Sequence, residues 1–156
     1  MRKIRILCVG KHKDTYVKQG LLSFEKKLHR FCDLEFIFLK EADYHRGSIS
    51  QSLSDEARRI EKTLSPRHFT VICDDKGKSF SSTGFASELS TQANRGFSTA
   101  DFIIGGPFGL SEEIKKTGNL RMSLSSMTFT HQLVRLVLIE QIYRAFTIIN
   151  NEKYHH

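Results

Sequence analysis

The fold is decided by the stretch SLSSMTFTHQLVRLVLIEQIYR, which runs from Ser123 to Arg144. Its first part is small and rich in hydroxyl groups, and its second part is a long apolar run with few charges. On a helical wheel the apolar residues leave no continuous polar face; they are Leu133, Val134, Leu136, Val137, Leu138, Ile139, Ile142, Tyr143, Ala145 and Phe146. We therefore expect a polar loop fixed to the start of a helix that is covered on nearly every side.

Strands and helices alternate along the rest of the chain. Apolar runs predict strands at 2–9, 34–39, 69–74, 100–104 and 120–124. Helical spacing predicts helices over 15–30, from the serines at 48–54 to Leu64, around Phe85 and Leu89, and after Ser111. Residues 41–50 have little periodicity and are expected to form a loop. This alternation predicts an α/β fold with a mainly parallel sheet flanked by helices on both faces.

Length and composition limit the class of protein. A chain of 156 residues is expected to form a single domain, 1–156. Cys8, Cys32 and Cys73 are odd in number and lack metal-ligand spacing, so they read as core residues of a reducing compartment. No apolar run approaches the roughly 18 residues of a membrane span, and the start of the chain has no signal-peptide layout. We expect a cytoplasmic protein.

The net charge of +7 favours a polyanionic partner. Nucleic acid becomes the leading partner class, although many small cytosolic proteins are basic without one. The exposed basic residues that could contact phosphate are Lys11, Lys13, Lys18, Arg46, Lys76 and Lys78. No RNA-binding module such as an RRM signature is present.

Three loops follow predicted strands and therefore meet at the carboxyl edge of the sheet. They span 73–78, 105–109 and 125–130, and each is rich in glycine or in small hydroxyl residues. Ligands of open α/β sheets bind at this edge, and such loops let a ligand approach backbone N–H and C=O groups closely. Each loop alone is more often an ordinary turn. Together they predict a pocket for a small molecule that carries an adenine or a sugar.

Several other chemistries are disfavoured. The first strand is followed by Gly10-Lys11-His12-Lys13, which does not fit the dinucleotide fingerprint, and no phosphate-binding P-loop occurs. The histidines are scattered, apart from a terminal pair, so no metal site is expected. No nucleophile elbow of the hydrolase type is present.

The chain resembles the ribosomal large subunit methyltransferase H family. The resemblance rests on Gly105-Gly106-Pro107-Phe108-Gly109-Leu110, on LSSMTFTHQ at 124–132, on RLVLIEQIYRA at 135–145, on the terminal Tyr154-His155, and on the opening strand that ends Val9-Gly10-Lys11. It implies a SPOUT enzyme that is a homodimer with a C-terminal trefoil knot. It also implies that S-adenosyl-L-methionine is used to methylate N3 of a pseudouridine in helix 69 of 23S rRNA, within the assembled ribosome.

The resemblance also implies site residues. The cofactor pocket would be formed, mostly through backbone groups, by Cys73, Gly106, Ser125, Ser126, Met127, Thr128, Phe129 and Thr130. Two positions depart from the family pattern. Thr130 replaces a common proline, which is expected to loosen the loop, and His156 replaces a common basic residue.

Candidate catalytic residues are Arg144, Tyr154 and His155. Methyl transfer is an in-line displacement that depends on alignment, and the weakly acidic N3–H must lose its proton to a base or beside a group that stabilises the anion. His155 is the candidate base, and Arg144 the candidate stabiliser. Arg144 also lies four residues after Glu140, so a structural ion pair is an equal alternative. For His131 we expect a capping or core role.

A second copy of the chain is expected to cover part of the helix that follows Leu133, because so small a domain cannot bury it on all sides. Two other functions stay open. One is a non-catalytic ribosome or RNA binder that keeps the fold, and the other is a SPOUT methyltransferase that acts on tRNA.

Overall fold

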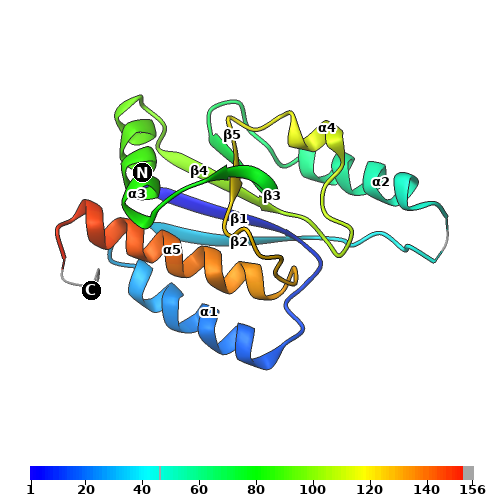
Figure 1. Cartoon of the computed structure of the whole chain (residues 1–156), viewed down its shortest axis with the longest axis horizontal. Helices are drawn as coiled ribbons and strands as arrows, with labels where there is room; N and C mark the ends of the chain where they lie inside the picture. Colours follow the sequence, from blue (N-terminus) through cyan, green and yellow to red (C-terminus); the bar gives the residue numbers. More distant parts are fainter. Residues whose placement is uncertain (46, 153–156) are drawn as a thin grey trace.

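The computed structural model describes residues 1–45 and 47–152, which form one five-stranded parallel sheet in the order β2-β1-β4-β3-β5 (Figure 1). The strands are β1 Lys3–Val9, β2 Asp33–Leu39, β3 Phe69–Ser79, β4 Thr99–Ile104 and β5 Leu120–Ser123. The helices are α1 Thr15–Leu28, α2 Ile49–Glu61, α3 Ser82–Asn94, α4 Glu112–Lys115 and α5 Leu133–Ile149. The predicted α/β class is confirmed. The trefoil knot stays a prediction.

Helices cover both faces of the sheet (Figure 1). On one face α1, α3 and α5 pack over a large apolar core that includes Ile4, Ile6, Phe102 and Ile142. On the other face α2 and α4 cover a smaller core built on Leu7, Ile72, Ile103 and Ile114. The two sets alternate along each strand, since successive side chains of a strand point to opposite faces.

Helix α5 lies in the larger core, but the rest of the chain does not bury the helix fully. Eight of its residues are buried, among them Leu138, Ile142 and Phe146. Gly20 of α1 lets the two helices approach closely, because a Cβ at this glycine would lie 2.7 Å from a methyl group of Leu136. Leu133 and Val137 remain partly exposed. The expected cover on nearly every side is therefore incomplete within one chain.

Serine side chains begin three of the helices, as the sequence indicates for α2 and α4. Ser48, Ser81 and Ser111 accept hydrogen bonds from the backbone N–H groups of Gln51, Gly84 and Ile114. Each bond satisfies one of the donors that a helix leaves unpaired in its first turn. These caps fix where the covering helices start.

One boundary differs from the prediction. Strand β3 does not end at Asp74 but continues to Ser79. The ladder to β5 is interrupted between Cys73 and Lys78, which both pair with Met122. The intervening residues arch out, and β3 then pairs again with β5. The loop expected over 73–78 is thus a bulge within a strand, because acidic and glycine residues mimic a turn in the sequence.

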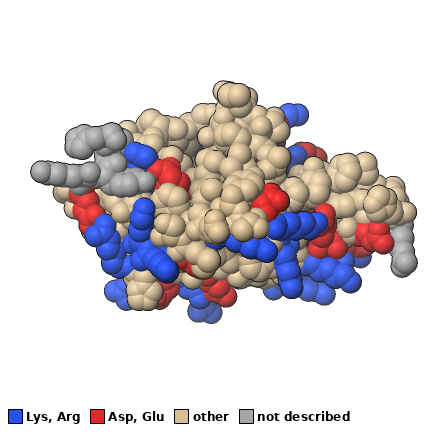
Figure 2. All heavy atoms as spheres, turned by 90° about the horizontal axis from the view of Figure 1, so that it is seen from below, with Lys and Arg blue, Asp and Glu red and all other residues tan. Residues whose placement is uncertain are grey.

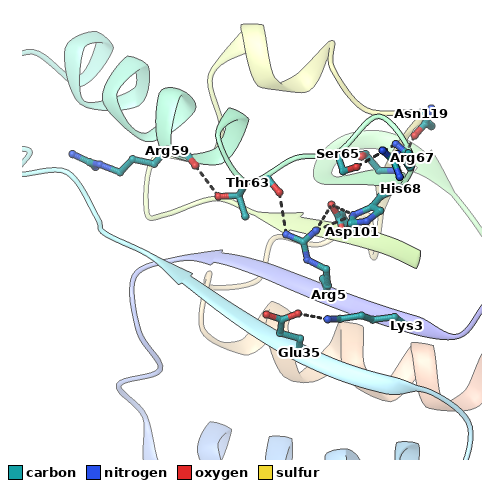
Figure 3. Close-up of polar contacts among 11 residues, drawn as sticks. Lys3, Arg5, Glu35, Arg59, Thr63, Ser65, Arg67, His68, Asp101 and Asn119 are labelled. Carbon is teal, nitrogen blue, oxygen red and sulfur yellow. Dashed lines mark hydrogen bonds and ion pairs between the residues drawn. The ribbon is translucent and has the colours of Figure 1, made fainter. Parts of the chain in front are cut away.

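A buried ionic cluster joins strands toward their amino ends (Figure 3). Arg5 and Asp101 are neighbours in the register of β1 and β4, and Asp101 is fully buried. Arg5 Nη1 lies 3.4 Å from the Asp101 carboxylate, and Arg5 Nη2 donates to the Thr63 carbonyl at 3.0 Å. His68 Nδ1 lies 3.1 Å from both Asp101 carboxylate oxygens. Buried charges are tolerated because they are paired in this way.

Among the residues that the structure describes, no helix is both long and apolar enough to cross a membrane.

Replacing Asp101 by Asn should lower the free energy of unfolding by about 3 kcal/mol, because it leaves the Arg5 guanidinium buried without its counter-charge. Glu35→Gln is the control. It removes the exposed pair between Lys3 and Glu35, whose atoms are 2.7 Å apart, and should cost under about 1 kcal/mol. Urea unfolding followed by circular dichroism gives both values. Equal effects of the two variants would contradict a stabilising role of the buried cluster.

Candidate functional site

A cavity of about 630 Å³ opens at the carboxyl edge of the sheet. Its walls come from three segments that are far apart in sequence, 73–76, 104–110 and 122–131, with Ser126 excepted. Lys115 and Val134 complete the lining. The structure therefore brings together the three segments that the sequence indicated, at the edge where open α/β sheets bind ligands.

The turn after β4 requires its glycines. The Gly109 N–H donates to the Gly106 carbonyl at 3.0 Å, and the two residues form an isolated antiparallel bridge. A Cβ on Gly105 would lie 2.4 Å from the Gly109 carbonyl oxygen, and Gly109 itself has a φ of 78°. Side chains are excluded from both positions. Backbone groups of this turn can therefore come into direct contact with a ligand.

The loop between β5 and α5 is fixed by its own hydroxyl groups. Ser123 Oγ donates to the Ser125 carbonyl at 2.8 Å, and Ser125 Oγ accepts from the Met127 N–H at 2.9 Å. Thr130 Oγ1 accepts from the Leu133 N–H at 3.2 Å, next to a 3.0 Å bond from the Val134 N–H to the Thr130 carbonyl. Thr130, which replaces the proline of the family pattern, thus bonds to the first turn of α5, and the expected loosening of the loop stays a prediction.

The arch of β3 is fixed by a charged network on the cavity rim. Arg121 donates to the Asp74 carboxylate at 2.7 Å and 2.6 Å, and Lys115 lies 3.6 Å from it. Burial alone would raise the pKa of Asp74, but hydrogen bonds at Asp75 and Lys76 and the nearby cations lower it below its ordinary value. The carboxylate is therefore ionised at neutral pH and ties β3, β5 and α4 together.

Tyr44 and Glu56 lie outside the cavity and support the lining residue Phe108. The Tyr44 ring lies 4.5 Å from the Phe108 ring, between centroids, and its hydroxyl donates to Glu56 Oε1 at 2.8 Å. Glu56 is 2% exposed and also accepts from the Ala42 N–H at 2.8 Å. Burial and this carboxylate raise the pKa of Tyr44. Sequence reasoning missed Glu56, because a glutamate on a helix usually points to solvent.

Most of the predicted cofactor residues line the cavity; they are Cys73, Gly106, Ser125, Met127, Thr128, Phe129 and Thr130. Ser126 is exposed and is not part of the lining. Burial raises the pKa of the Cys73 thiol, so this residue offers backbone atoms and a neutral thiol rather than a thiolate. Met127 is 75% exposed, which leaves one wall open to solvent.

Of the predicted catalytic residues, the structure describes only Arg144, and Arg144 does not line this cavity. Arg144 pairs with Glu140 on the same helix, with Nη2 2.7 Å from the carboxylate, as the structural alternative predicts. It lies ten residues beyond Val134, which is about 15 Å along a helix at ~1.5 Å per residue. Tyr154, His155 and His156 lie outside the described residues, as does Arg46.

Sequence reasoning also missed how α5 is joined to the end of β1. Gln132 Nε2 donates to the Lys11 carbonyl at 3.1 Å, and Gln132 Oε1 accepts from the Lys13 N–H at 3.1 Å. Arg135 is fully buried and donates to the Val9 carbonyl at 2.7 Å. Two polar residues at the apolar start of α5 were the available signal, since such residues need partners when buried.

His12 is held neutral by this arrangement. Arg135 Nη1, which can only donate, lies 3.1 Å from His12 Nδ1, so this nitrogen must accept. The imidazole packs edge-on against Phe36 and Phe38. Burial, followed by the charges of Arg135 and Lys18, lowers the pKa of His12 to about 4.

Two other hollows, of about 590 and 570 Å³, lie along 25–34 and along 40–59. Neither is lined by any of the three predicted loops. Within the described residues, no group of three or more histidine, cysteine, aspartate or glutamate side chains is placed to hold a metal ion. The cavity at the carboxyl edge is thus the best candidate for a functional site, and its size suits a small organic ligand.

Comparison with known proteins gives consistent matches. A family model described as "Predicted SPOUT methyltransferase" matches residues 2–155. Proteins named "Ribosomal RNA large subunit methyltransferase H" from Streptococcus pyogenes serotype M49 (strain NZ131) and serotype M3 (strain SSI-1) are 43% identical over 98% of this chain and 99% of their own length. A probable methylase family protein from Haemophilus influenzae Rd KW20 has a similar fold, with a TM-score of 0.54 and 13% identity over 98% of this chain and 70% of that chain.

The His12 environment predicts a loss of stability on acidification between pH 6.5, the ordinary pKa, and about 4, the pKa in the folded protein. In this window the unfolded chain binds more protons than the folded chain, so stability falls as the pH drops through it. His12→Asn keeps an acceptor for Arg135 but does not titrate. Urea unfolding at a series of pH values should give a shallower pH dependence for the variant. Parallel curves for the two proteins would rule out His12 as a source of the pH dependence.

Proposed function

The chain belongs to the SPOUT methyltransferase family, and we propose that it uses S-adenosylmethionine to methylate N3 of a pseudouridine in helix 69 of 23S rRNA. The observation that carries the activity is the 43% identity, over nearly the full length, to enzymes named for methylation of large-subunit ribosomal RNA. The chain is accordingly an rRNA methyltransferase. The base and the donor are our proposal, supported by the motifs quoted above and by the cavity. A ribosomal substrate also favours the cytoplasm.

The cavity suits S-adenosylmethionine for three reasons. Its floor is apolar, with Ile104, Leu110 and Met122, which fits a flat heteroaromatic ring. Its walls expose backbone groups of the Gly105–Gly109 turn and of the 125–130 loop, which can bind an adenine and a ribose. The close approach at Gly105 leaves the turn without side chains that would fill the site. When bound, the cofactor supplies an electrophilic methyl group.

The residues of the chain then have two tasks, which are to align N3 of the base and to handle its proton. The fixed loops at Ser123–Thr130 and Gly105–Gly109 would hold the methyl donor in one position. Alignment of the two reactants is the main requirement of an in-line displacement. We assign proton removal to His155 and stabilisation of the developing anion to Arg144, and Tyr154 is a third candidate.

Arg144 reaches a cavity only if it is the cavity of a second subunit. Arg144 lies about 15 Å along α5 from Val134, which lines the cavity of the same chain. Partly exposed Leu133 and Val137 lie one turn apart on α5. Burial of such apolar side chains is typical of subunit interfaces. We propose a homodimer in which α5 of one subunit lies beside the cavity of the other.

The activity is tested by incubating the purified protein with ribosomes that lack the modification and with methyl-labelled S-adenosylmethionine. Mass spectrometry should find one new methyl group on a pseudouridine of helix 69 in 23S rRNA. Label in tRNA alone would indicate a different substrate. Binding of ribosomes without binding of the cofactor in calorimetry would indicate a non-catalytic binder.

Gly105→Ala should weaken cofactor binding at least tenfold, because the new Cβ would lie 2.4 Å from the Gly109 carbonyl oxygen and force the turn apart. Gly84→Ala is the control. Gly84 lies in the first turn of α3, away from the cavity, and a Cβ there would lie 3.1 Å from the Ser81 hydroxyl, so this variant changes local packing without touching the turn after β4. Calorimetric titration with S-adenosylmethionine measures both. Unchanged affinity in Gly105→Ala would place the cofactor away from this turn.

The double variant Leu133→Glu with Val137→Glu should be a monomer in analytical ultracentrifugation, whereas the unmodified chain should be a dimer at micromolar concentration. Charges at an apolar interface would be desolvated without partners. Ile49→Glu is the matched control, since Ile49 is 47% exposed on α2, on the opposite face of the sheet. A monomeric unmodified chain, or a double variant that stays dimeric, would contradict the proposed interface.

A further inference from the structure

We propose that Lys11, Lys13 and His131 form a rim beside the cavity that binds the phosphate backbone of the substrate RNA. This inference rests on the proposed function, and it identifies which of the many basic residues contact RNA. The rim is defined by these three residues. The proposal rests on three observations. They are the position of the β1–α1 loop, the contacts from α5 that hold this loop, and the tautomer that hydrogen bonding imposes on His131.

The rim lies directly next to the cavity. Cys8 of β1 pairs with Ile104 of β4, so the loops after these two strands leave the sheet side by side. A Cβ on Gly106 would lie 3.2 Å from the Val9 side chain, which puts the glycine turn against the end of β1. His131 itself lines the cavity. A nucleotide whose base enters the cavity would therefore have its backbone near this loop.

The loop between β1 and α1 is held by hydrogen bonds from the start of α5. Gln132 bonds to the backbone of both Lys11 and Lys13, at 3.1 Å each. Arg135 holds Val9 and His12, and its Nε has no hydrogen-bond partner among the described residues. Burying a cation without a carboxylate is costly. Helix α5 keeps such a cation where it binds the end of β1 and the loop that follows it.

The tautomer of His131 follows from the same contacts. The Lys13 N–H can only donate and the Lys11 carbonyl can only accept, so the orientation of the Gln132 amide is fixed. Its nitrogen, a donor, lies 3.1 Å from His131 Nε2, which must therefore accept. The proton of the neutral ring is then on Nδ1, which has no hydrogen-bond partner among the described residues. Burial and the Arg135 charge lower the pKa of His131, which keeps the ring neutral.

The two lysines are available for phosphate. Lys11 is exposed and has no ion-pair partner within the described residues. The Lys13 side chain is 71% exposed, and its nearest carboxylate, Glu41, is 3.8 Å away. Two ammonium groups and one neutral N–H donor match the oxygens of a phosphate backbone. Ammonium contacts give salt-dependent affinity, whereas the neutral imidazole contributes a hydrogen bond that releases no counterion.

Two other basic candidates lie on β3, across the cavity from this loop. Lys76 follows the acidic pair Asp74 and Asp75, and the Lys78 ammonium lies 4.6 Å from the Phe80 ring centroid. Figure 2, a view from the side of α1 and α5, shows Lys and Arg side chains in separate groups toward the two ends of this face. One group lies toward the end where α1 begins, immediately after Lys11 and Lys13.

The test is the salt dependence of ribosome binding. The dissociation constant for ribosomes is measured between low and moderate KCl for the unmodified chain, for Lys11→Gln with Lys13→Gln, and for Lys62→Gln. The double variant should bind about tenfold more weakly, with a log–log salt slope lower by about 2, one for each phosphate contact. Lys62 is exposed at the end of α2, near the amino edge of the sheet, and its variant should match the unmodified chain. The affinity of all three for S-adenosylmethionine should be equal.

His131→Phe and Gln132→Met separate the remaining parts. Each should weaken ribosome binding several-fold with an unchanged salt slope, because a neutral donor or the support of the loop is lost while both lysine charges remain. A double lysine variant that binds ribosomes as the unmodified chain does, or one that loses affinity for the cofactor instead, would overturn the proposal. Ribosome binding that follows the expected pattern without methyl transfer would support the rim and refute the proposed function.

Discussion

The structure depends on a buried cation at the start of α5. Arg135 is fully buried among apolar side chains and bonds to the Val9 carbonyl at the end of β1. With Gln132 it joins the helix to the first strand through bonds that a purely apolar helix could not make. The free-energy cost of burying this charge is offset only while β1, the loop after it and α5 keep this arrangement. The loop that begins the cavity wall, Ser125–Thr130, is held at the same point.

The two edges of the sheet have different tasks. Toward the amino ends, Arg5, His68 and Asp101 form a compact ionic cluster with its partners in place. At the carboxyl edge, glycines and hydroxyl groups expose backbone atoms, and charged residues such as Asp74 and Lys115 lie on the rim. Both edges therefore carry ion pairs, but the glycine turn and the hydroxyl-rich loop that line the cavity lie only at the carboxyl edge.

The proposed catalytic residue Arg144 does not line the cavity of its own chain. The cavity is built from segments of one chain, whereas Arg144 lies far along α5 and pairs with Glu140. The same helix leaves Leu133 and Val137 partly exposed. These two facts have a common explanation if one surface of α5 both joins two subunits and carries a catalytic side chain to the neighbouring cavity. In such an arrangement a single helix of a small domain would contribute to the core, to the subunit interface and to the reaction.

The sequence by itself determined the α/β class, the five strands and the three segments that meet at the cavity, because hydrophobic periodicity and glycine or serine clusters are local signals. It did not reveal that β3 continues past Asp74, since a bulge and a turn use the same residues. It also left Arg135, Gln132 and Glu56 as ordinary polar residues of helices. Only the tertiary structure gave them partners, because the atoms that they bind belong to segments distant in sequence, or to a loop without periodicity, and hydrogen bonding of a buried polar group depends on what lies around it in space.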